Sequence, residues 1–529
     1  MTAQRGSPPL VMRFLPLAVL LAAGVITLAA CASGGGGQLL PPAPEPAVSL
    51  RASLSFGPVP EGTTSAPMTV TLTNVGSASL TFTSNPGLSG ANAADFAITA
   101  ATCSTASQVA AGANCTVTLT FKPSTAAGES ASLGFADNAS PSSQSVALSG
   151  GASSSVNNVL AVQVNAGPPA AGGEDVDILF ASVTICVPGT ANCQTIDNVE
   201  VDTGSSGLRL LASQVNIALP QATVGGNPLA ECIQFVDTTY GFGSVATADI
   251  QMAGEVASSV PIQVLAAPGF TNVPNSCSSG APADYNLDSV LALGANGLIG
   301  VGLFRQDCGQ YCNSAPAPSG FYYSCPNALC SPVLVPLTSQ LQNPVWMFPQ
   351  DNNGVLISLP AADPGGDAII NGSLIFGIDT QADNAHGAAQ IYTTDANGNF
   401  TATYKNIAYS GSFVDSGSNG IFFLDTPQTG LTDCSGQLTG FYCSSSGTPF
   451  TVINQGANGV PGQIMFSIVD ARTLFSNNNA NNFAFSNLGG PFTAPEEFDY
   501  GLAFFFGRSV FTGIEGQQTG GVLGPFFAF

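Results

Sequence analysis

The chain has 529 residues, with 9 Lys and Arg against 32 Asp and Glu, a net charge of -23, and a single histidine, His386. This length allows several domains, and the scarcity of cations excludes the basic surface that nucleic-acid binding needs. One histidine cannot supply a two-histidine zinc site, and a Ser-His or Cys-His enzyme would depend on it alone. Hydrolytic chemistry in this chain would therefore run on carboxylates.

An export signal opens the chain. Arg5 and Arg13 precede an apolar run at 14–30, which is short and alanine-rich for a membrane span. The run ends in Leu-Ala-Ala-Cys at 28–31, which resembles a bacterial lipobox. The resemblance implies that residues 1–31 are a lipoprotein signal peptide ending in a lipidated Cys31, and Ala next to it implies sorting to the outer membrane. The alternatives are an ordinary secretory signal cleaved nearby and an uncleaved anchor.

A spacer follows the signal. Residues 32–47 hold four consecutive glycines and then a proline-rich stretch. Glycine gives slack and proline gives extension, so we expect a tether with few core-forming residues.

The cysteines support export. Setting aside Cys31 leaves twelve of the 13 cysteines, and an even number of close neighbours is typical of disulfides in an oxidising compartment. The spacings are not paired CxxC, so we expect no metal site and no cofactor. The sequence leaves the connectivity open; the neighbours are Cys103 and Cys115, Cys186 and Cys193, Cys308 and Cys312, Cys325 and Cys330, and Cys434 and Cys443, with Cys232 and Cys277 left over.

Residues 48–151 predict a small antiparallel β-sandwich. Apolar and polar residues alternate between Gly, Pro and Asn turns, most clearly at 68–74 and 115–121. Short strands without a helical period are typical of such sandwiches. The segment resembles bacterial members of the abnormal-spindle/hydin-type immunoglobulin-like domain at 54–57, 72–76, 95–96, 121–123 and 148–150. This resemblance implies a spacer or interaction module without catalytic residues.

The remainder, 156–529, predicts a large β-rich domain after a Ser- and Asn-rich linker. It contains two similar acid loops: Val-Asp-Thr-Gly-Ser-Ser-Gly-Leu at 201–208 is echoed by Val-Asp-Ser-Gly-Ser-Asn-Gly-Ile at 414–421. The separation is far longer than one supersecondary unit and indicates two lobes. Glycine permits a tight loop, and the hydroxyls can hydrogen-bond the acid and favour its ionised form.

The paired loops resemble the Asp-(Thr/Ser)-Gly loops of pepsin-like aspartic peptidases, although the domain looks closest to an uncharacterised family of bacterial exported proteins. The resemblance implies a mainly β chain, in which the immunoglobulin-like sandwich precedes a bilobed pepsin-like β domain. It also implies that Asp202 and Asp415 are catalytic, that Ser205 hydrogen-bonds Asp202, and that Ser418 stands in the matching place beside Asp415. The supporting residues it implies are Thr203, Gly204, Ser205, Ser416, Gly417 and Ser418.

Three further segments follow the order of that family. Residues 239–244, followed by 248–252, resemble the flap hairpin that closes over substrate, with Tyr240, Gly241 and Gly243 in it. Residues 296–303 resemble the segment that packs beneath the first acid loop, and 372–379 the strand and turn at the lobe junction. The second-lobe counterpart of the packing segment stays open between 500–502 and 522–524.

Arg209 and Glu200 are among the residues that depart from the family pattern. Arg209 stands where the family favours an aromatic residue. Glu200, two residues before Asp202, should project from the same strand face, where the family is usually apolar and lies near the cleft. A third acid there would either raise the pKa values of the pair or favour a basic substrate side chain.

These observations predict a lipid-anchored, exported aspartic endopeptidase. Asp202 and Asp415 would share one water and one proton and would hydrolyse a peptide or protein substrate without metal or cofactor. We expect a monomer in the cell envelope, attached to the outer membrane through Cys31, with no nucleic-acid partner. The alternative is a non-catalytic cell-envelope protein that keeps the acid loops as structure and binds a peptide or glycan between its lobes.

Overall fold

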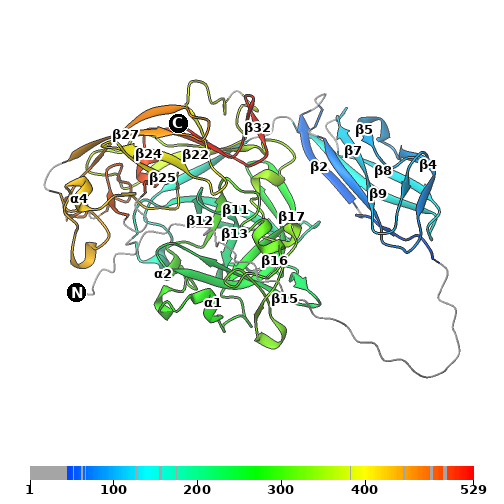
Figure 1. Ribbon diagram of the computed structural model, residues 1–529, viewed down its shortest axis with the longest axis horizontal. Coiled ribbons are helices and arrows are strands. Elements are labelled where there is room, and N and C mark those ends of the chain that lie inside the picture. The colour runs from blue at the N-terminus through cyan, green and yellow to red at the C-terminus, as the bar shows by residue number, and fades with distance from the viewer. Residues whose placement is uncertain are drawn as a thin grey trace, which may run out of the picture. The chain divides into compact units, whose positions relative to one another are not determined.

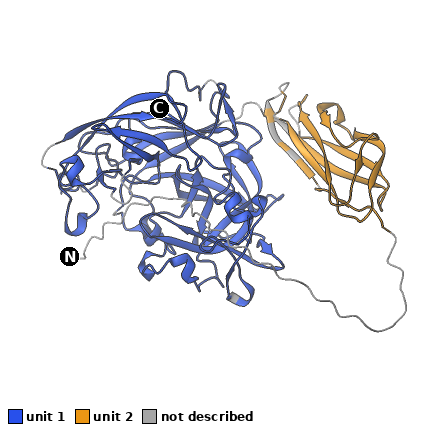
Figure 2. Cartoon of the chain, in the orientation of Figure 1, with its two compact units in different colours: residues 1–13, 157–529 blue, residues 14–156 orange. Residues whose placement is uncertain are grey.

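The computed structural model describes residues 44–51, 53–60, 64–65, 67–124, 128–153, 158–173, 175–381, 383–444, 447–476, 481–492 and 497–529. The predicted signal peptide, Cys31 and most of the tether lie outside these residues. The chain is mainly β, as predicted, and it divides into two compact units (Figure 2). We call the unit within 14–156 the sandwich unit and the unit within 157–529 the large unit. No helix among the described residues has the length and apolar character to cross a membrane.

The sandwich unit has two sheets, which confirms the immunoglobulin-like prediction. One has the order β1-β3-β7-β5, with β1 at Val48–Ser49, β3 at Met68–Asn74, β7 at Asn114–Phe121 and β5 at Phe96–Ala101. The other has the order β2-β9-β8-β4-β6, with β2 at Ser53–Pro60, β9 at Ser143–Ser153, β8 at Gly128–Asp137, β4 at Leu80–Ser89 and β6 at Gln108–Val109.

Alternation of side chains builds this sandwich. In β7 the residues Cys115, Val117, Leu119 and Phe121 are buried, and the threonines between them face outward. Successive side chains of a strand point to opposite faces, so one face of β7 supplies core while the other meets water. The strands predicted at 68–74 and 115–121 are therefore confirmed.

The large unit is built on one long, curled sheet and one smaller sheet (Figure 1). In order, the long sheet contains β20 (Ser331–Pro332), β19 (Tyr322–Ser324), β15 (Asn227–Gln234), β16 (Tyr240–Met252), β17 (Glu255–Leu265), β13 (Ser206–Leu211), β18 (Gly297–Val301), β12 (Cys193–Asp202), β11 (Leu179–Cys186), β10 (Val159–Val164), β22 (Ile370–Phe376), β21 (Gly354–Ser358), β31 (Ser509–Gly513), β34 (Phe526–Ala528) and β23 (Ile391–Thr393), with β14 (Thr223–Val224) paired to β15. The smaller sheet contains β28 (Pro461–Ile468), β27 (Thr448–Gln455), β24 (Phe400–Tyr404), β25 (Ile407–Val414), β30 (Asp499–Tyr500), β26 (Ile421–Phe423) and β29 (Gly489–Pro491).

Helices in the described part of this unit are short. They are α1 (Asn275–Ser278), α2 (Val290–Leu293), α3 (Gln310–Asn313), α4 (Thr426–Thr429), α5 (Ala471–Leu474) and α6 (Leu502–Phe505). A separate ribbon pairs β32 (Gln518–Thr519) with β33 (Val522–Leu523).

Strands from both ends of the large unit meet in the middle of the long sheet. β22 pairs with β10 on one side and with β21 on the other, and β21 pairs with β31. The predicted junction strand at 372–379 is therefore confirmed in place. Because β10 comes early in the unit and β31 late, this part of the sheet ties the first half of the unit (158–381) to the second half (383–529).

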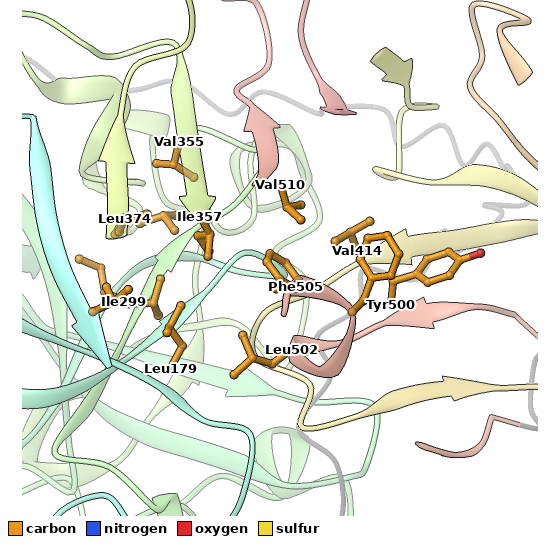
Figure 3. Close-up of a cluster of buried hydrophobic side chains, with 14 of the residues drawn as sticks. Leu179, Ile299, Val355, Ile357, Leu374, Val414, Tyr500, Leu502, Phe505 and Val510 are labelled. Atoms are coloured by element: carbon orange, nitrogen blue, oxygen red, sulfur yellow. The ribbon is translucent and has the colours of Figure 1, made fainter. Parts of the chain in front are cut away.

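One apolar core continues beneath this junction. Figure 3 shows Leu179, Ile299, Val355, Ile357 and Leu374 from the first half beside Val414, Tyr500, Leu502, Phe505 and Val510 from the second. Burial of apolar surface contributes about 25 cal/mol per Å², so a core shared by both halves stabilises their arrangement as well as each half. The two acid loops are attached to this shared core.

The described residues contain six disulfides, one within the sandwich unit and five within the large unit. Five join the predicted close neighbours, and the sixth joins Cys232 to Cys277, the two cysteines that the sequence left over. Disulfides form and persist in oxidising compartments, so these six indicate an extracytoplasmic protein.

Candidate active site

The two acid loops leave equivalent strand pairs. β12 ends at Asp202 and runs parallel to β18, with Asp202 opposite Gly300. β25 ends one residue before Asp415 and runs parallel to β30, with Val414 opposite Tyr500. Each acid therefore emerges at the end of a buried strand, beside a second strand that runs in the same direction.

This equivalence identifies the packing segment of the second half. In the first half, the Gly302 N–H donates to the Ser205 carbonyl oxygen over 2.8 Å; in the second, the Leu502 N–H donates to the Ser418 carbonyl oxygen over 2.7 Å. The counterpart of the predicted segment at 296–303 is therefore 500–502. The other possibility, 522–524, belongs instead to the ribbon of β32 and β33 and the turn after it.

Hydrogen bonds cross between the loops. The Thr203 N–H donates to Ser416 Oγ over 3.1 Å, and the Ser416 N–H donates to Thr203 Oγ1 over 2.9 Å. Ser416 Oγ in turn donates to the Val201 carbonyl oxygen over 2.7 Å. All these groups are buried, where an unpaired polar group is costly, so the crossed bonds fix one loop against the other.

The crossed bonds bring the two carboxyl groups together. Asp202 is 2% exposed and Asp415 is 1% exposed. The Gly204 N–H donates to Asp202 Oδ1 over 2.7 Å, and the Gly417 N–H donates to Asp415 Oδ1 over 2.8 Å, so each loop orients its own acid. A side-chain hydrogen bond also joins Asp415 to Asp202.

Glycine is required where each loop faces the opposite acid. A Cβ at Gly204 would lie 2.6 Å from Asp415 Cγ, and a Cβ at Gly417 would lie 2.8 Å from Asp202 Oδ1 and 3.2 Å from Asp415 Oδ1. Any side chain at Gly204 would push the carboxylates apart. The Asp-(Thr/Ser)-Gly pattern thus has a physical reason at each of its three positions in this chain.

Asp415 favours its protonated form. Burial raises the pKa of Asp415 well above its ordinary value, the charges of Asp202 and then Asp499 raise it further, and so does the hydrogen bond with Asp202. Two buried carboxyl groups in contact cannot both ionise cheaply, so the negative charge of Asp202 favours a proton on Asp415. Such a pair can accept a proton from one group while donating a proton to another.

The two supporting serines behave differently. Ser418 Oγ donates to Asp499 Oδ2 over 2.7 Å and lies 3.3 Å from Asp415 Oδ2, so it links a third acid to the pair. Ser205 Oγ is buried, and it has no hydrogen-bond partner among the described residues. Its side chain lies against Gly300, where a Cβ would be 2.6 Å from the hydroxyl. The predicted hydrogen bond from Ser205 to Asp202 is therefore absent from this structure.

Each half carries one further acid near its acid loop. In the first half this acid lies on the strand that leads into the loop, and in the second half it lies on the neighbouring strand. On β12 and β18, Glu200 lies opposite Leu298; at the equivalent places on β25 and β30, Phe413 lies opposite Asp499. Glu200 is 3% exposed and Asp499 is fully buried. Burial first, and the charges of Asp202 and Asp175 second, raise the pKa of Glu200 well above its ordinary value.

Arg209 forms a buried ion cluster behind the first acid loop. Its Nη1 donates to the Ser206 carbonyl oxygen over 2.9 Å, and its Nη2 lies 3.3 Å from Glu231 Oε1 and 3.6 Å from Asp307 Oδ2. The Tyr322 hydroxyl lies 2.7 Å and 2.8 Å from the two Asp307 oxygens. Arg209 therefore joins the loop to β15 and to the segment after β18. Sequence reasoning found the unusual residue but missed these partners.

The two segments predicted as a flap hairpin, 239–244 and 248–252, do not form a hairpin with each other. Residues 240–252 form one continuous strand, β16, which pairs with β15 before it and β17 after it, so the turn of the β15–β16 hairpin lies at 235–239. A Cβ at Gly243 would lie 2.0 Å from the Val264 carbonyl oxygen, and one at Gly241 would lie 2.7 Å from Leu265 Cδ2. These glycines allow β16 to pack closely on its neighbours and do not form a turn.

Tyr240 is correspondingly buried. It is 4% exposed and packs in an apolar cluster with Phe242, Tyr323 and the Cys232–Cys277 disulfide. Burial raises the pKa of its hydroxyl, and the charges that add to this effect belong to Asp288 and Asp284 and not to the acid loops.

Asp499 is the functional candidate that sequence reasoning missed. The signal was present, because Asp499 precedes Gly501 by the same two residues that separate Leu298 from Gly300. Alignment of 500–502 with the packing segment of the first half would have identified Asp499 as a residue beside the second acid loop. Within the described residues, no group of three or more His, Cys, Asp or Glu side chains is arranged to hold a metal ion.

Comparison with known proteins identifies a family whose function is unknown. A family model described as "Protein of unknown function (DUF3443)" matches residues 154–529. No curated protein matches the chain.

Three solved structures show low similarity. A protein of unknown function from Porphyromonas gingivalis W83 is 13% identical, with a TM-score of 0.18, over 21% of this chain and 50% of that one. The Vibrio cholerae VesB protease is 22% identical, with a TM-score of 0.16, over 20% of this chain and 31% of that one. The ASH/PapD-like domain 7 of human CEP192 is 18% identical, with a TM-score of 0.17, over 23% of this chain and 99% of that one. This chain thus matches half the length of the first protein and under a third of the second. Similarity this low says nothing about the activity of this chain.

Proposed function

We propose that this chain, which belongs to the DUF3443 family of proteins of unknown function, is an aspartic endopeptidase with a pepsin-like arrangement of its two acid loops. The observation that carries the proposal is the contact between Asp202 and Asp415, held by the crossed hydrogen bonds of Thr203 and Ser416. Two loops from distant parts of the chain present their acids to each other, each beside a glycine that leaves room for the opposite carboxyl group.

The proton is proposed to start on Asp415, because burial and neighbouring charges favour its protonated form. Asp202 takes a proton from a water molecule as the water oxygen attacks the peptide carbonyl carbon. Asp415 gives its proton to the carbonyl oxygen and stabilises the charge that develops there.

Collapse of the tetrahedral intermediate completes the cycle. The carbon–nitrogen bond breaks, the leaving nitrogen takes the proton from Asp202, and Asp415 recovers a proton from the hydroxyl of the intermediate. The pair ends with the one proton with which it began, so it can turn over without metal or cofactor.

We further propose that the protein is anchored in the cell envelope through a lipidated Cys31. The support is the lipobox-like run at 28–31 together with six disulfides in the exported part. Labelling cells with a fatty-acid analogue should mark the intact protein and leave Cys31→Ala unmarked; equal labelling of both would contradict the anchor.

The test of the activity is hydrolysis of a mixed peptide library by the mature protein between pH 3 and 7, with new peptide ends identified by mass spectrometry. We expect cleavage by the intact protein and none by Asp202→Asn or Asp415→Asn, with all three equally folded by circular dichroism. Cleavage that survives in either variant would refute the proposed roles.

One observation favours the alternative, a non-catalytic protein that binds a peptide or glycan. Both acids are almost fully buried, at 2% and 1% exposure, as expected of a structural clasp between the halves. Absence of cleavage at every pH, with both Asn variants less stable than the intact protein, would support this alternative.

A further inference from the structure

Glu200 is a buried acid beside one of the two proposed catalytic residues. It lies two residues before Asp202 on β12, and residues two apart on a strand project from the same face. The charge of Asp202 acts on Glu200 directly. Glu200 is thus a close neighbour of Asp202 on the same face of β12.

No cation among the described residues serves Glu200. The charged groups that act on it are Asp202 and Asp175, both of them acids, and no hydrogen bond to its carboxyl group is found in the described part of the chain. At 3% exposure it is almost withdrawn from water. Ionisation of such a group costs free energy unless a positive charge or hydrogen-bond donors compensate it, so a cation that reached Glu200 would stabilise its ionised carboxylate.

The surroundings of Glu200 are apolar. Phe180 lies opposite it on β11 and Leu298 lies opposite it on β18, so both share its face of the sheet. Both belong to a buried cluster that also contains Ile233 and Phe235, from the hairpin of β15 and β16. Apolar walls around one carboxyl group match a side chain with a long apolar stem and a charged head, as in lysine and arginine.

The second half of the unit provides the contrast. Phe413 occupies the place of Glu200, and the acid there, Asp499, is fully buried and already accepts a hydrogen bond from Ser418. Glu200 is therefore the flanking acid that still lacks a donor. We propose that Glu200 is a specificity-determining residue that receives a lysine or arginine side chain of the peptide, so that the substrate class is basic peptides. This inference rests on the proposed function, because substrate selection requires that the protein is a peptidase.

The experiment compares peptides that differ in one charge. Each peptide carries a single lysine or, at the same position, norleucine, which has a similar stem and no charge, and the residue is moved along the sequence. The intact protein should cleave the lysine peptide with a kcat/KM on the order of tenfold higher at one position, as expected for a charge-assisted hydrogen bond. Glu200→Gln, close in shape, should bring the ratio of the two kcat/KM values to about one.

The controls separate this inference from the proposed function. Asp202→Asn should abolish cleavage of both peptides, while calorimetry should still find the lysine peptide bound more tightly than its norleucine partner. Cleavage with no lysine preference, or with a preference that Glu200→Gln leaves unchanged, would overturn the inference and leave the peptidase proposal standing. Absence of all cleavage with a Glu200-dependent preference in binding would overturn the peptidase and retain the basic ligand, and absence of both would overturn both.

Discussion

Thr203 and Ser416 hold each other across the two acid loops: the backbone N–H of each donates to the side-chain oxygen of the other, over 3.1 Å and 2.9 Å. This reciprocal pair explains why the loops need a hydroxyl after each aspartate. It also makes the geometry of the acids depend on a contact that can be removed with a single substitution.

Replacing Thr203 by valine should loosen the acid pair. The shape is retained, but the Ser416 N–H is left buried without its acceptor, so we expect a loss of about 1–3 kcal/mol in the free energy of unfolding. Chemical denaturation measures the loss, and peptide cleavage should fall with it. Thr203→Ser keeps the hydroxyl and is the matched control. Equal behaviour of the two variants would show that the crossed hydrogen bonds do not matter.

Adding one methyl group at Gly204 should separate the carboxyl groups. The new Cβ of Gly204→Ala would lie within 2.7 Å of three atoms of the Asp415 carboxyl group, closer than non-bonded atoms approach. We expect cleavage to be lost and the melting temperature to fall. Gly447→Ala, where the nearest atom would be 3.6 Å away, is the matched control. A Gly204→Ala protein with full activity would contradict the close approach of the acids.

The sequence predicted most of the architecture because its signals were local. Alternation defined the strands of the sandwich, and the repeated acid loops indicated two related halves. Five disulfides join close sequence neighbours, although the sequence left the connectivity open, and Cys232 and Cys277 pair over 45 residues and meet only after the chain has folded.

The failures came from contacts between distant strands. Residues 239–244 and 248–252 resembled a flap hairpin, whereas 240–252 are one strand, β16, and the glycines at 241 and 243 serve its packing against Val264 and Leu265. Ser205 and Ser418 look equivalent in sequence, yet only Ser418 meets an acid on the neighbouring strand, Asp499. Such differences depend on which residue lies opposite on the neighbouring strand. The sequence pattern along one strand does not contain this information.

Asp499 should set the alkaline limit of activity. Its negative charge raises the pKa of Asp415, so Asp499→Asn should lower that pKa. Under the proposed mechanism Asp415 must be protonated, and the alkaline limb of the kcat/KM profile should therefore move to lower pH. Glu497→Gln removes one charge two residues earlier and should move the limb less. A limb that stays in place or moves to higher pH in Asp499→Asn would contradict the role of its charge.

Removing Arg209 should expose the cost of its buried partners. Burial raises the pKa of Glu231 to about 8 and that of Asp307 to about 6, although Arg209 acts to lower both. Breaking a buried ion cluster from one side costs about 3–5 kcal/mol, which we expect for Arg209→Met near neutral pH.

The loss should depend on pH in a defined direction. Without the cation both pKa values rise further above those of the unfolded chain, so the folded state binds more protons and its stability falls as pH rises. Unfolding by denaturant should therefore show a larger difference between Arg209→Met and the intact protein at pH 8 than at pH 5. Adding Glu231→Gln and Asp307→Asn should recover part of the loss at pH 8. A larger difference at pH 5 would show that the cluster is not held by charge.

The central claim is that Asp202 and Asp415 act together on one oxygen atom, and its most direct test is the binding of a peptide analogue whose hydroxyl group replaces the attacking water. Calorimetry should find this analogue bound more tightly by the intact protein than the same peptide without the hydroxyl. The difference should disappear in Asp202→Asn and in Asp415→Asn. A hydroxyl that adds affinity when only one of the two acids is present, or that adds none to the intact protein, would contradict the account.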